Sequence, residues 1–304
     1  MNARISEMDK IKWENSVWFF DIDDTLSDTS DVSSDATEGI RRVFKNKYGD
    51  DTALAVKNQV NAYYNLMLSG YRVKNEKGWE SVEGGKEAFQ NLLQTVEKFQ
   101  PSIVKEFGAM KKWSREIFVK MASDRLGISV TPELVHEAVD AYWVELSRIT
   151  SAYPDAVELI KEIKIHNRPI YLLTSSDARL KMQPDGKFIY DPVYSEALKR
   201  ERIELLREKG IDFNILSIGD PEDKPHRDFF EKAIKKASEE YGSSIDLSNS
   251  IMVGDSFSGD LQTPKEQMGF GLVVLVDRTK PHLEVIDEHQ INTDNLMQVT
   301  KFII

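Results

Sequence analysis

Residues 20–26 read Phe-Asp-Ile-Asp-Asp-Thr-Leu and directly follow the apolar residues Val-Trp-Phe at 17–19. The apolar run has the length of a buried strand, and three acids stand where it ends. Asp21 and Asp23 are two residues apart, so on an extended chain their side chains point to the same side. Two carboxylates held this close need a proton or a cation between them, and Mg²⁺ prefers such oxygen ligands. The alternative interpretation is an acidic turn that merely caps the next helix.

Four further apolar runs have the same character, at residues 170–173, 215–218, 251–253 and 272–276. Each is nearly continuous rather than alternating, which is typical of parallel strands covered on both faces. Helical patterns lie between them, at 154–166 and from Lys224 to about Gly242, where Pro225 is expected to be the first helical residue. Strands that alternate with helices predict a doubly wound, Rossmann-like α/β sheet.

One interval, residues 31–150, contains no convincing strand. Its patterns predict helices over residues 36–48, 52–68, 85–99, 113–126 and 131–148. In the last of these, Thr131 suits the N-cap and Pro132 the first helical position. We therefore predict a core domain of residues 1–30 and 151–304, with an all-helical domain, residues 31–150, inserted after the first strand.

Composition narrows the classes of function. The chain has 304 residues, a formal net charge of -11 and no cysteine, so disulfides, thiolate metal sites and a cysteine nucleophile are excluded. Its negative charge opposes binding to nucleic acid or acidic membranes. The polar N-terminus lacks the apolar stretch of a secretory signal, and no apolar run is long enough to span a membrane. We expect a cytoplasmic protein with no nucleic-acid or membrane partner.

Three more polar signals occur at predicted strand or helix ends. Asp255 follows the strand at 251–253, and Asp260 stands in the next loop, before a predicted capping box at residues 263–266. Lys224 precedes a helix, where the helix dipole disfavours a cation, so nearby carboxylates or a phosphate would explain it. Thr174 and Ser175 end the strand at 170–173, where a hydroxyl and backbone N–H groups can bind phosphate. Taken singly, each signal has a simpler interpretation. Asp255 and Asp260 can belong to an Asp-rich turn, Lys224 can be a solvated surface lysine, and Thr174 and Ser175 can form a Ser/Thr turn.

The order of these signals makes them specific. The sequence resembles the haloacid dehalogenase superfamily, which carries Asp-x-Asp-x-Thr after the first strand, Ser or Thr after the second, Lys before a later helix, and Gly-Asp with a second Asp after the fourth strand. The residues from 20–26, 174, 224 and 254–260 reproduce that order. The resemblance covers about residues 14–30 and 150–280. It implies the family's α/β core and phosphotransfer chemistry.

By this resemblance, Asp21 is the nucleophile that forms an aspartyl-phosphate. Asp23 would protonate the leaving oxygen and then activate water, and its presence argues against halide displacement, because dehalogenases lack this second acid. Mg²⁺ would be bound by the carboxylates of Asp21 and Asp255 and the backbone carbonyl of Asp23.

The remaining site residues would handle the phosphoryl group. The resemblance implies that Thr174, with Ser175, binds the phosphate and that Lys224 balances its charge. Asp260 would hold a metal-bound water or Lys224. Ser175 departs from the asparagine that is common in relatives, which leaves the identity of the substrate in doubt.

The helical insertion corresponds to the C1-type cap of the family, which implies a small phosphorylated substrate. Three cations, Lys111, Lys112 and Arg115, can contact substrate, although a solvated helix face is the simpler interpretation. Seven aromatic residues can line a pocket, although a helical core is the simpler interpretation: Tyr63, Tyr64, Tyr71, Trp79, Trp113, Tyr142 and Trp143. Arg179 is near enough to Thr174 in sequence to touch the phosphate, or it lies on a surface loop. The expected function is a Mg²⁺-dependent phosphatase. A phosphomutase or phosphotransferase of the same family, or a catalytically silent binding module on this scaffold, remains an alternative, and nothing indicates the oligomeric state.

Overall fold

The fold is given by a computed structural model that describes residues 11–73, 76–279 and 281–304. These residues form two compact units. We call the first the core unit (described residues up to 30, with 150–176 and 200–304) and the second the helical unit (31–149 and 177–199). The sequence had assigned all of 151–304 to the core, so the grouping of 177–199 with the helices differs from the expected division.

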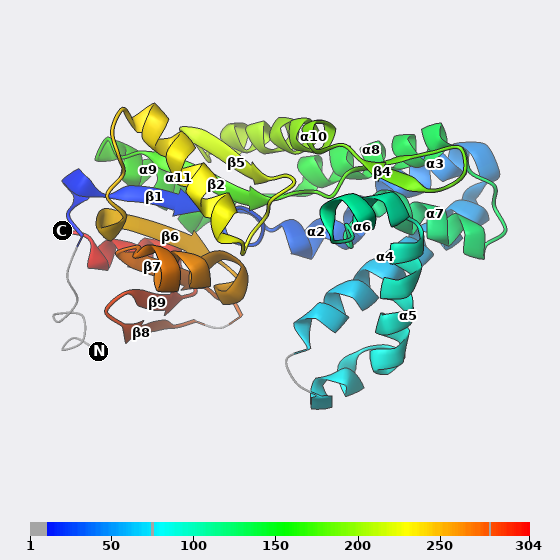
Figure 1. The fold of residues 1–304 in the computed structure, drawn as a ribbon, viewed down its shortest axis with the longest axis horizontal. Helices are drawn as coiled ribbons and strands as arrows, with labels where there is room; N and C mark the ends of the chain where they lie inside the picture. The colour runs from blue at the N-terminus through cyan, green and yellow to red at the C-terminus, as the bar shows by residue number, and fades with distance from the viewer. Residues whose placement is uncertain (1–10, 74–75, 280) are drawn as a thin grey trace. The chain divides into compact units, whose positions relative to one another are not determined.

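The core unit contains a seven-stranded sheet in the order β5-β2-β1-β6-β7-β9-β8 (Figure 1). All neighbours are parallel except β8, which pairs antiparallel with β9. The strands are β1 (Val17–Phe20), β2 (Ile170–Ser175), β5 (Ile215–Gly219), β6 (Ser250–Gly254), β7 (Leu272–Val276), β8 (Leu283–Asp287) and β9 (Gln290–Thr293). The five predicted strands are confirmed, and β8 and β9 are additional.

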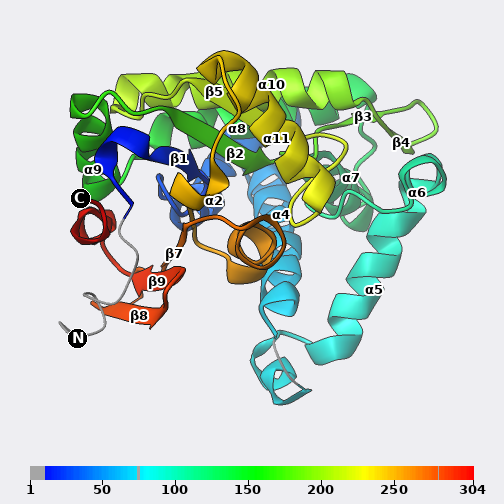
Figure 2. The ribbon, with the colours of Figure 1, turned by 60° about the vertical axis from the view of Figure 1, so that its left-hand side comes forward.

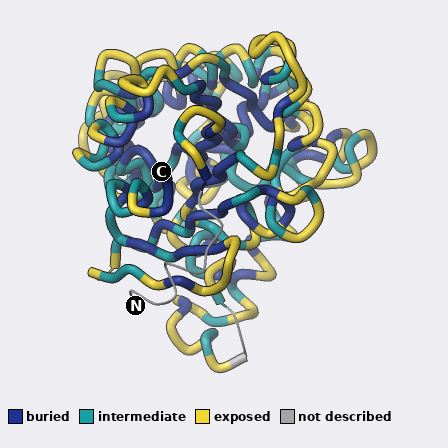
Figure 3. Tube along the Cα trace, turned by 90° about the vertical axis from the view of Figure 1, so that its left-hand side faces the viewer, coloured by how far each residue is buried: buried dark blue, intermediate teal, exposed yellow. Residues whose placement is uncertain are grey.

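Alternate residues of β1 build two separate apolar layers. Trp18 and Phe20 pack on one face of the sheet with α9 (Pro154–Ile165), while Val17 and Phe19 pack on the other face with α11 (Arg227–Tyr241). All four side chains are buried. Figure 3 shows in dark blue where buried residues lie along the chain, and Figure 2 shows α9 and α11 in a second view. Helices on both faces explain why the parallel strands read as continuous apolar runs, and the doubly wound α/β fold is confirmed.

Short helical turns complete the core unit. They are η1 (Trp13–Asn15), η3 (Leu205–Lys209), η4 (Leu247–Asn249), η5 (Phe257–Leu261), η6 (Pro264–Met268) and η7 (Leu296–Phe302).

Two local predictions are wrong here, the second only in part. Helix α11 begins at Arg227 and not at Pro225, because the His226 N–H closes a turn onto the Asp223 carbonyl before the helix starts. Thr263 stands at the N-cap position before Pro264, as predicted, but its side chain makes no capping hydrogen bond, since its hydroxyl donates to the Pro225 carbonyl at 2.7 Å.

Helices make up most of the helical unit, together with one hairpin. The elements are α2 (Thr29–Ala36), α3 (Glu38–Tyr48), α4 (Asp50–Arg72), η2 (Glu76–Ser81), α5 (Gly85–Lys98), α6 (Pro101–Phe107), α7 (Arg115–Arg125), α8 (Pro132–Ile149), β3 (Leu180–Met182) and β4 (Phe188–Tyr190). Helix α10 (Pro192–Glu204) begins in this unit and ends in the core unit. At the start of α8 the Thr131 hydroxyl accepts from the Leu134 N–H at 3.3 Å, as expected for a capping residue.

The hairpin supplies four buried side chains to the apolar core of the helical unit, namely Leu180, Met182, Phe188 and Tyr190. The two ends of segment 177–199 are joined by a buried ion pair, in which Lys199 Nζ lies 2.8 Å from Asp177 Oδ1. Segment 177–199 is therefore an integral part of the helical unit and not a surface loop.

Among the described residues, no helix combines the length and the apolar character that crossing a membrane would require.

Candidate active site

Asp21 lies directly beyond the last residue of β1 and remains attached to the sheet. Its N–H donates to the Val253 carbonyl at 2.9 Å, so the backbone continues the ladder with β6 for one more residue. The chain then turns sharply: the Leu26 N–H returns to the Ile22 carbonyl at 2.9 Å, and Asp24 adopts a left-handed conformation with φ 64°. Asp and Asn tolerate this conformation better than most residues. The acids are thus presented at the carboxyl edge of the sheet.

Both carboxylate oxygens of Asp21 are held. Lys224 Nζ donates to Oδ1, and the Thr25 hydroxyl donates to Oδ2 at 3.1 Å. Only 5% of Asp21 is exposed. The side chain therefore has a fixed direction, as a positioned nucleophile requires.

Lys224 connects three parts of this edge. Besides Asp21, its Nζ donates to Asp260 Oδ1 at 2.6 Å and to the Leu173 carbonyl of β2 at 3.3 Å. Burial alone would lower the pKa of this lysine, but the carboxylates of Asp21 and Asp260 hold its pKa above the usual range. Lys224 is therefore a permanent positive charge among these acids.

Asp260 reaches the site because the π-helical turn η5 folds back onto the end of β6. The Asp260 N–H donates to the Ser256 carbonyl at 2.8 Å, and the Ser256 N–H donates to Asp260 Oδ2 at 3.1 Å. Gly254 allows this approach, since a Cβ at that position would lie 2.5 Å from the Asp260 Cβ. The glycine of the Gly-Asp motif is thus required by packing.

Asp21, Asp255 and Asp260 form an acidic cluster in which one oxygen of each lies within 4.8 Å of the others. Burial, together with the charges of Asp260 and Asp23, raises the pKa of Asp21 to about 7 despite the adjacent Lys224. Desolvation, followed by the charges of Asp21 and Asp260, raises the pKa of Asp255 to about 8. Asp255 as a residue is exposed, so the charges of Asp21 and Asp260 are the main reason that its pKa is raised.

The acidic cluster fits a divalent cation. Three carboxylates face one ammonium, so negative charge remains uncompensated, and the raised pKa values record that repulsion. All the converging side-chain donors of the cluster are hard oxygens, the type that Mg²⁺ and Ca²⁺ bind.

Asp23 lies outside the acidic cluster. Its Oδ1 accepts from the Thr29 hydroxyl at 2.9 Å and lies 3.6 Å from Nη2 of Arg202. Neither Thr29 nor Arg202 was singled out from the sequence. Arg202 could not have been, because it is 179 residues away and follows no motif.

Thr174 and Ser175 form the last two residues of β2. Thr174 is fully buried, and its hydroxyl donates to the Ser175 carbonyl at 3.4 Å. The residue before it, Leu173, supplies the carbonyl that Lys224 contacts. The structure thus brings the end of β2 to the same edge as Asp21, Lys224 and Asp260.

The haloacid dehalogenase-like hydrolase model matches residues 17–266, which is most of the chain. The chain belongs to this hydrolase family. No significant match was found among curated proteins.

Solved structures of other haloacid dehalogenase (HAD) proteins resemble this chain only distantly. A 2-haloacid dehalogenase from Pseudomonas syringae is 16% identical, with 94% of this chain and 97% of that chain covered and a TM-score of 0.49. YfnB of Bacillus subtilis, solved bound to magnesium, is 12% identical, with 95% and 97% covered and a TM-score of 0.48. A HAD phosphatase from Thermococcus onnurineus is 16% identical, with 94% and 96% covered and a TM-score of 0.45. Similarities this weak do not indicate which reaction this family member catalyses.

Arg179 of this HAD hydrolase does not lie on a surface loop. Only 3% of its side chain is exposed, and it contacts Glu116 at 2.6 Å and Asp140 at 2.5 Å, all within the helical unit. Segment 177–199 is anchored through these contacts. Phosphate binding by Arg179 is therefore not supported.

The three other cations that were candidates for substrate contact also have partners within the helical unit. Arg115 is buried, so a solvated helix face is wrong for it: its guanidinium lies 3.9 Å from the Tyr64 ring centroid and donates to the Tyr142 hydroxyl at 3.2 Å. Lys111 and Lys112 lie over the rings of Tyr190 and Tyr71.

Six of the seven aromatic residues that were candidates for a pocket belong to the helical core, namely Tyr63, Tyr64, Trp79, Trp113, Tyr142 and Trp143. The seventh, Tyr71, is 43% exposed and packs against Phe89 and Trp113.

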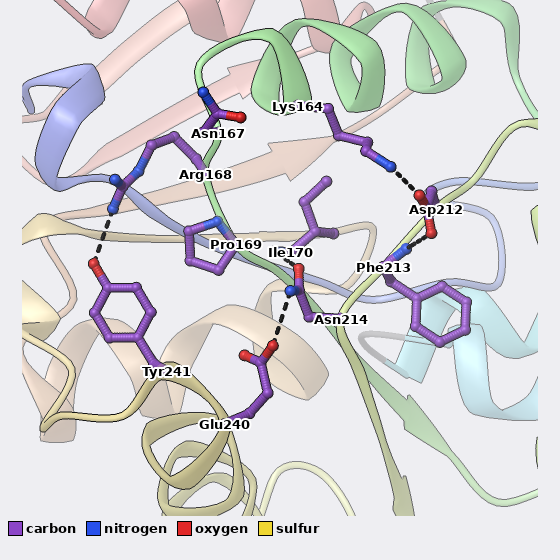
Figure 4. A pocket seen from close by; sticks show the side chains of 10 residues that line it. All are labelled: Lys164, Asn167, Arg168, Pro169, Ile170, Asp212, Phe213, Asn214, Glu240 and Tyr241. Atoms are coloured by element: carbon purple, nitrogen blue, oxygen red, sulfur yellow. Dashed lines mark hydrogen bonds and ion pairs between the residues drawn. The ribbon is translucent and has the colours of Figure 1, made fainter.

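A cavity of about 400 Å³ lies at the amino ends of β2 and β5, at the opposite edge of the sheet from Asp21 (Figure 4). Its polar side chains are engaged with one another, as Lys164 with Asp212, Arg168 with Tyr241, and Asn214 with Glu240. In open parallel sheets ligands bind beyond the carboxyl ends of the strands. The acidic cluster, and not this cavity, is the candidate active site of the HAD hydrolase.

Proposed function

We propose that this HAD hydrolase is a Mg²⁺-dependent phosphatase that acts on a small phosphorylated substrate through an aspartyl-phosphate on Asp21. One observation carries the proposal. Asp21 is fixed by Lys224 and Thr25 at the carboxyl edge of the sheet, with Asp255 and Asp260 beside it. A buried, oriented carboxylate next to a cation and two further acids is suited to attack on phosphorus.

The first half-reaction uses Asp21 and Asp23. As an Asp21 oxygen forms a bond to phosphorus, the bond from phosphorus to the leaving oxygen breaks, and Asp23 transfers its proton to that oxygen. Lys224 offsets charge on the phosphoryl group, and the hydroxyl of Thr174 and the N–H groups at Ser175 bind its oxygens. In the second half-reaction Asp23 accepts a proton from the attacking water, which releases phosphate and restores Asp21.

Mg²⁺ would be held by the carboxylates of Asp21 and Asp255 and by the backbone carbonyl of Asp23. When bound, it neutralises negative charge between the carboxylate and the incoming phosphate. Asp260 contributes through Lys224, to which its Oδ1 is bonded. That contact keeps the ammonium directed at Asp21.

Asp23 favours phosphate transfer over the halide displacement that some family members perform. Halide needs no proton when it leaves, whereas an alkoxide does, and Asp23 is an acid at the site where that proton is needed. For the helical unit we propose the role of a C1-type cap that selects the substrate, and we extend that cap to include residues 177–199.

The test is release of inorganic phosphate from a broad panel of phosphate esters with Mg²⁺. Asp21→Asn keeps the shape of the side chain but removes the nucleophile, so we expect turnover to fall by more than about a thousandfold. Asp228→Asn, which changes an exposed acid in the first turn of α11, is the matched control and should retain activity. If wild type and Asp21→Asn were equally inert on every ester, the binding-module alternative would replace the phosphatase.

A phosphomutase remains the second candidate, since it would use the same residues. Mass balance distinguishes the two. A phosphatase releases one phosphate for each ester consumed, whereas a mutase converts one phosphosugar into an isomer and leaves free phosphate unchanged.

A further inference from the structure

Arg202 lies on the last turn of α10, within the core unit, and faces the proposed acid-base residue. Its Nη2 is 3.6 Å from Asp23 Oδ1, and the Thr29 hydroxyl donates to the same oxygen at 2.9 Å. The Arg202 side chain is nine-tenths buried, whereas Asp23 is one-third exposed. A buried cation therefore sits behind a carboxylate that opens toward solvent.

Arg202 and Thr29 both act on Oδ1 of Asp23. A distance of 3.6 Å is too long for a hydrogen bond, so the attraction between Arg202 and Asp23 is that of two charges in a partly buried place. The Thr29 hydroxyl adds a directional hydrogen bond to the same oxygen. Together the two contacts fix the orientation of the Asp23 carboxylate.

We propose that Arg202 is a positioning residue that fixes the Asp23 carboxylate in the orientation from which it delivers the proton to the leaving oxygen. The proposal rests on the proposed function, because it presupposes Asp23 as the acid. Arginine suits the role, since it stays charged at any working pH and its long side chain reaches Asp23 from a different element. Arg202 itself does not touch substrate.

The test compares esters whose leaving groups need proton transfer to different degrees. A dinitrophenolate leaves without a proton, whereas an alkoxide requires one, so only alkyl phosphates depend on a correctly placed Asp23. The measured quantity is kcat/KM, which reports the steps up to departure of the leaving group. For Arg202→Gln we expect kcat/KM on an alkyl phosphate to fall about tenfold, a part of the usual contribution of an acid, and on 2,4-dinitrophenyl phosphate to stay within about twofold.

Two further variants complete the design. Arg202→Lys retains the charge and should recover part of the loss on the alkyl ester. Arg207→Gln, which removes an arginine that pairs with Glu204 and Asp212 and not with the site, should leave both values unchanged. The dinitrophenyl ester serves as the internal check that each variant is folded.

Each outcome decides the proposal. A selective loss on the alkyl ester, partly recovered by lysine, supports the positioning role. An equal loss on both esters, or no loss on either, overturns it while the phosphatase assignment stands. If wild type hydrolyses neither ester and no other ester of the panel, the proposed function fails and the positioning role fails with it.

Discussion

The two units differ in how their buried carboxylates and cations are balanced. In the helical unit, the buried guanidinium of Arg179 is matched by the buried carboxylate of Glu116, with the exposed Asp140 beside it, and the Lys199 ammonium is matched by Asp177. In the core unit, three carboxylates of the acidic cluster share the single ammonium of Lys224. A balanced network needs nothing more and holds the chain together. An unbalanced cluster keeps an excess of negative charge, which a bound cation can neutralise.

We expect the largest effect from changing the excess negative charge of the acidic cluster, either with Mg²⁺ or by removing a carboxylate. We predict that Mg²⁺ raises the melting temperature of the wild type, because binding at about 1,000 times Kd stabilises the folded state by about 4.1 kcal/mol. Asp255→Asn takes away one carboxylate of the acidic cluster and should abolish this stabilisation. Calorimetry with and without EDTA measures both. Equal stabilisation of wild type and variant would place the cation elsewhere.

Breaking the balanced network should act on stability alone. Glu116→Gln leaves Arg179 buried with only Asp140, so we expect the free energy of unfolding to drop by about 3 kcal/mol. Asp140 is 56% exposed, and Asp140→Asn should cost less than about 1 kcal/mol. Chemical denaturation gives both values. A drop for Asp140→Asn as large as that for Glu116→Gln would mean that the two acids do not differ as described.

A third comparison is a pH dependence of stability that only the unbalanced cluster should show. The pKa values of Asp21 and Asp255 are raised in the folded state, to about 7 and about 8, so the folded protein binds more protons than the unfolded chain at mildly acidic pH. Their favourable contribution is complete below the unfolded pKa near 4 and is lost as pH rises through 7 to 8. In EDTA, stability should therefore decline from pH 5 to pH 8.

Asp255→Asn provides the comparison for this pH dependence, because it removes one of the two shifted groups and lessens the repulsion on the other. The decline of melting temperature with pH should become shallower in the variant, and also in wild type saturated with Mg²⁺. The same slope in all three samples would contradict the assignment to the acidic cluster.

Much of this arrangement could be predicted from local sequence. The five central strands are continuous apolar runs because both faces of the sheet are covered, and that pattern is visible without any partner. Strands β8 and β9 were missed because β8 lies at the sheet edge with only Val285 buried, so its sequence carries little strand pattern. The hairpin of β3 and β4 was missed because three-residue strands are too short for periodicity to show.

The site was predictable to the extent that its residues end strands. Asp21, Thr174 and Asp255 follow apolar runs, and parallel topology brings such positions to one edge. Arg202 follows no such rule, since its contact with Asp23 depends on the path of α10. Arg179 was misjudged for a related reason: nearness in sequence to Thr174 did not reveal that the chain enters the helical unit at residue 177.

The split composition of the helical unit also bears on synthesis of the chain. Helices α2 to α8 lie within residues 29–149, but Leu180, Met182, Phe188 and Tyr190 of the same apolar core are translated later, after β2. The helices therefore emerge from the ribosome with part of their apolar surface still uncovered. Only when the chain has grown through residue 190 is every residue of that core available, so β2 of the core unit is made before the helical unit can finish folding.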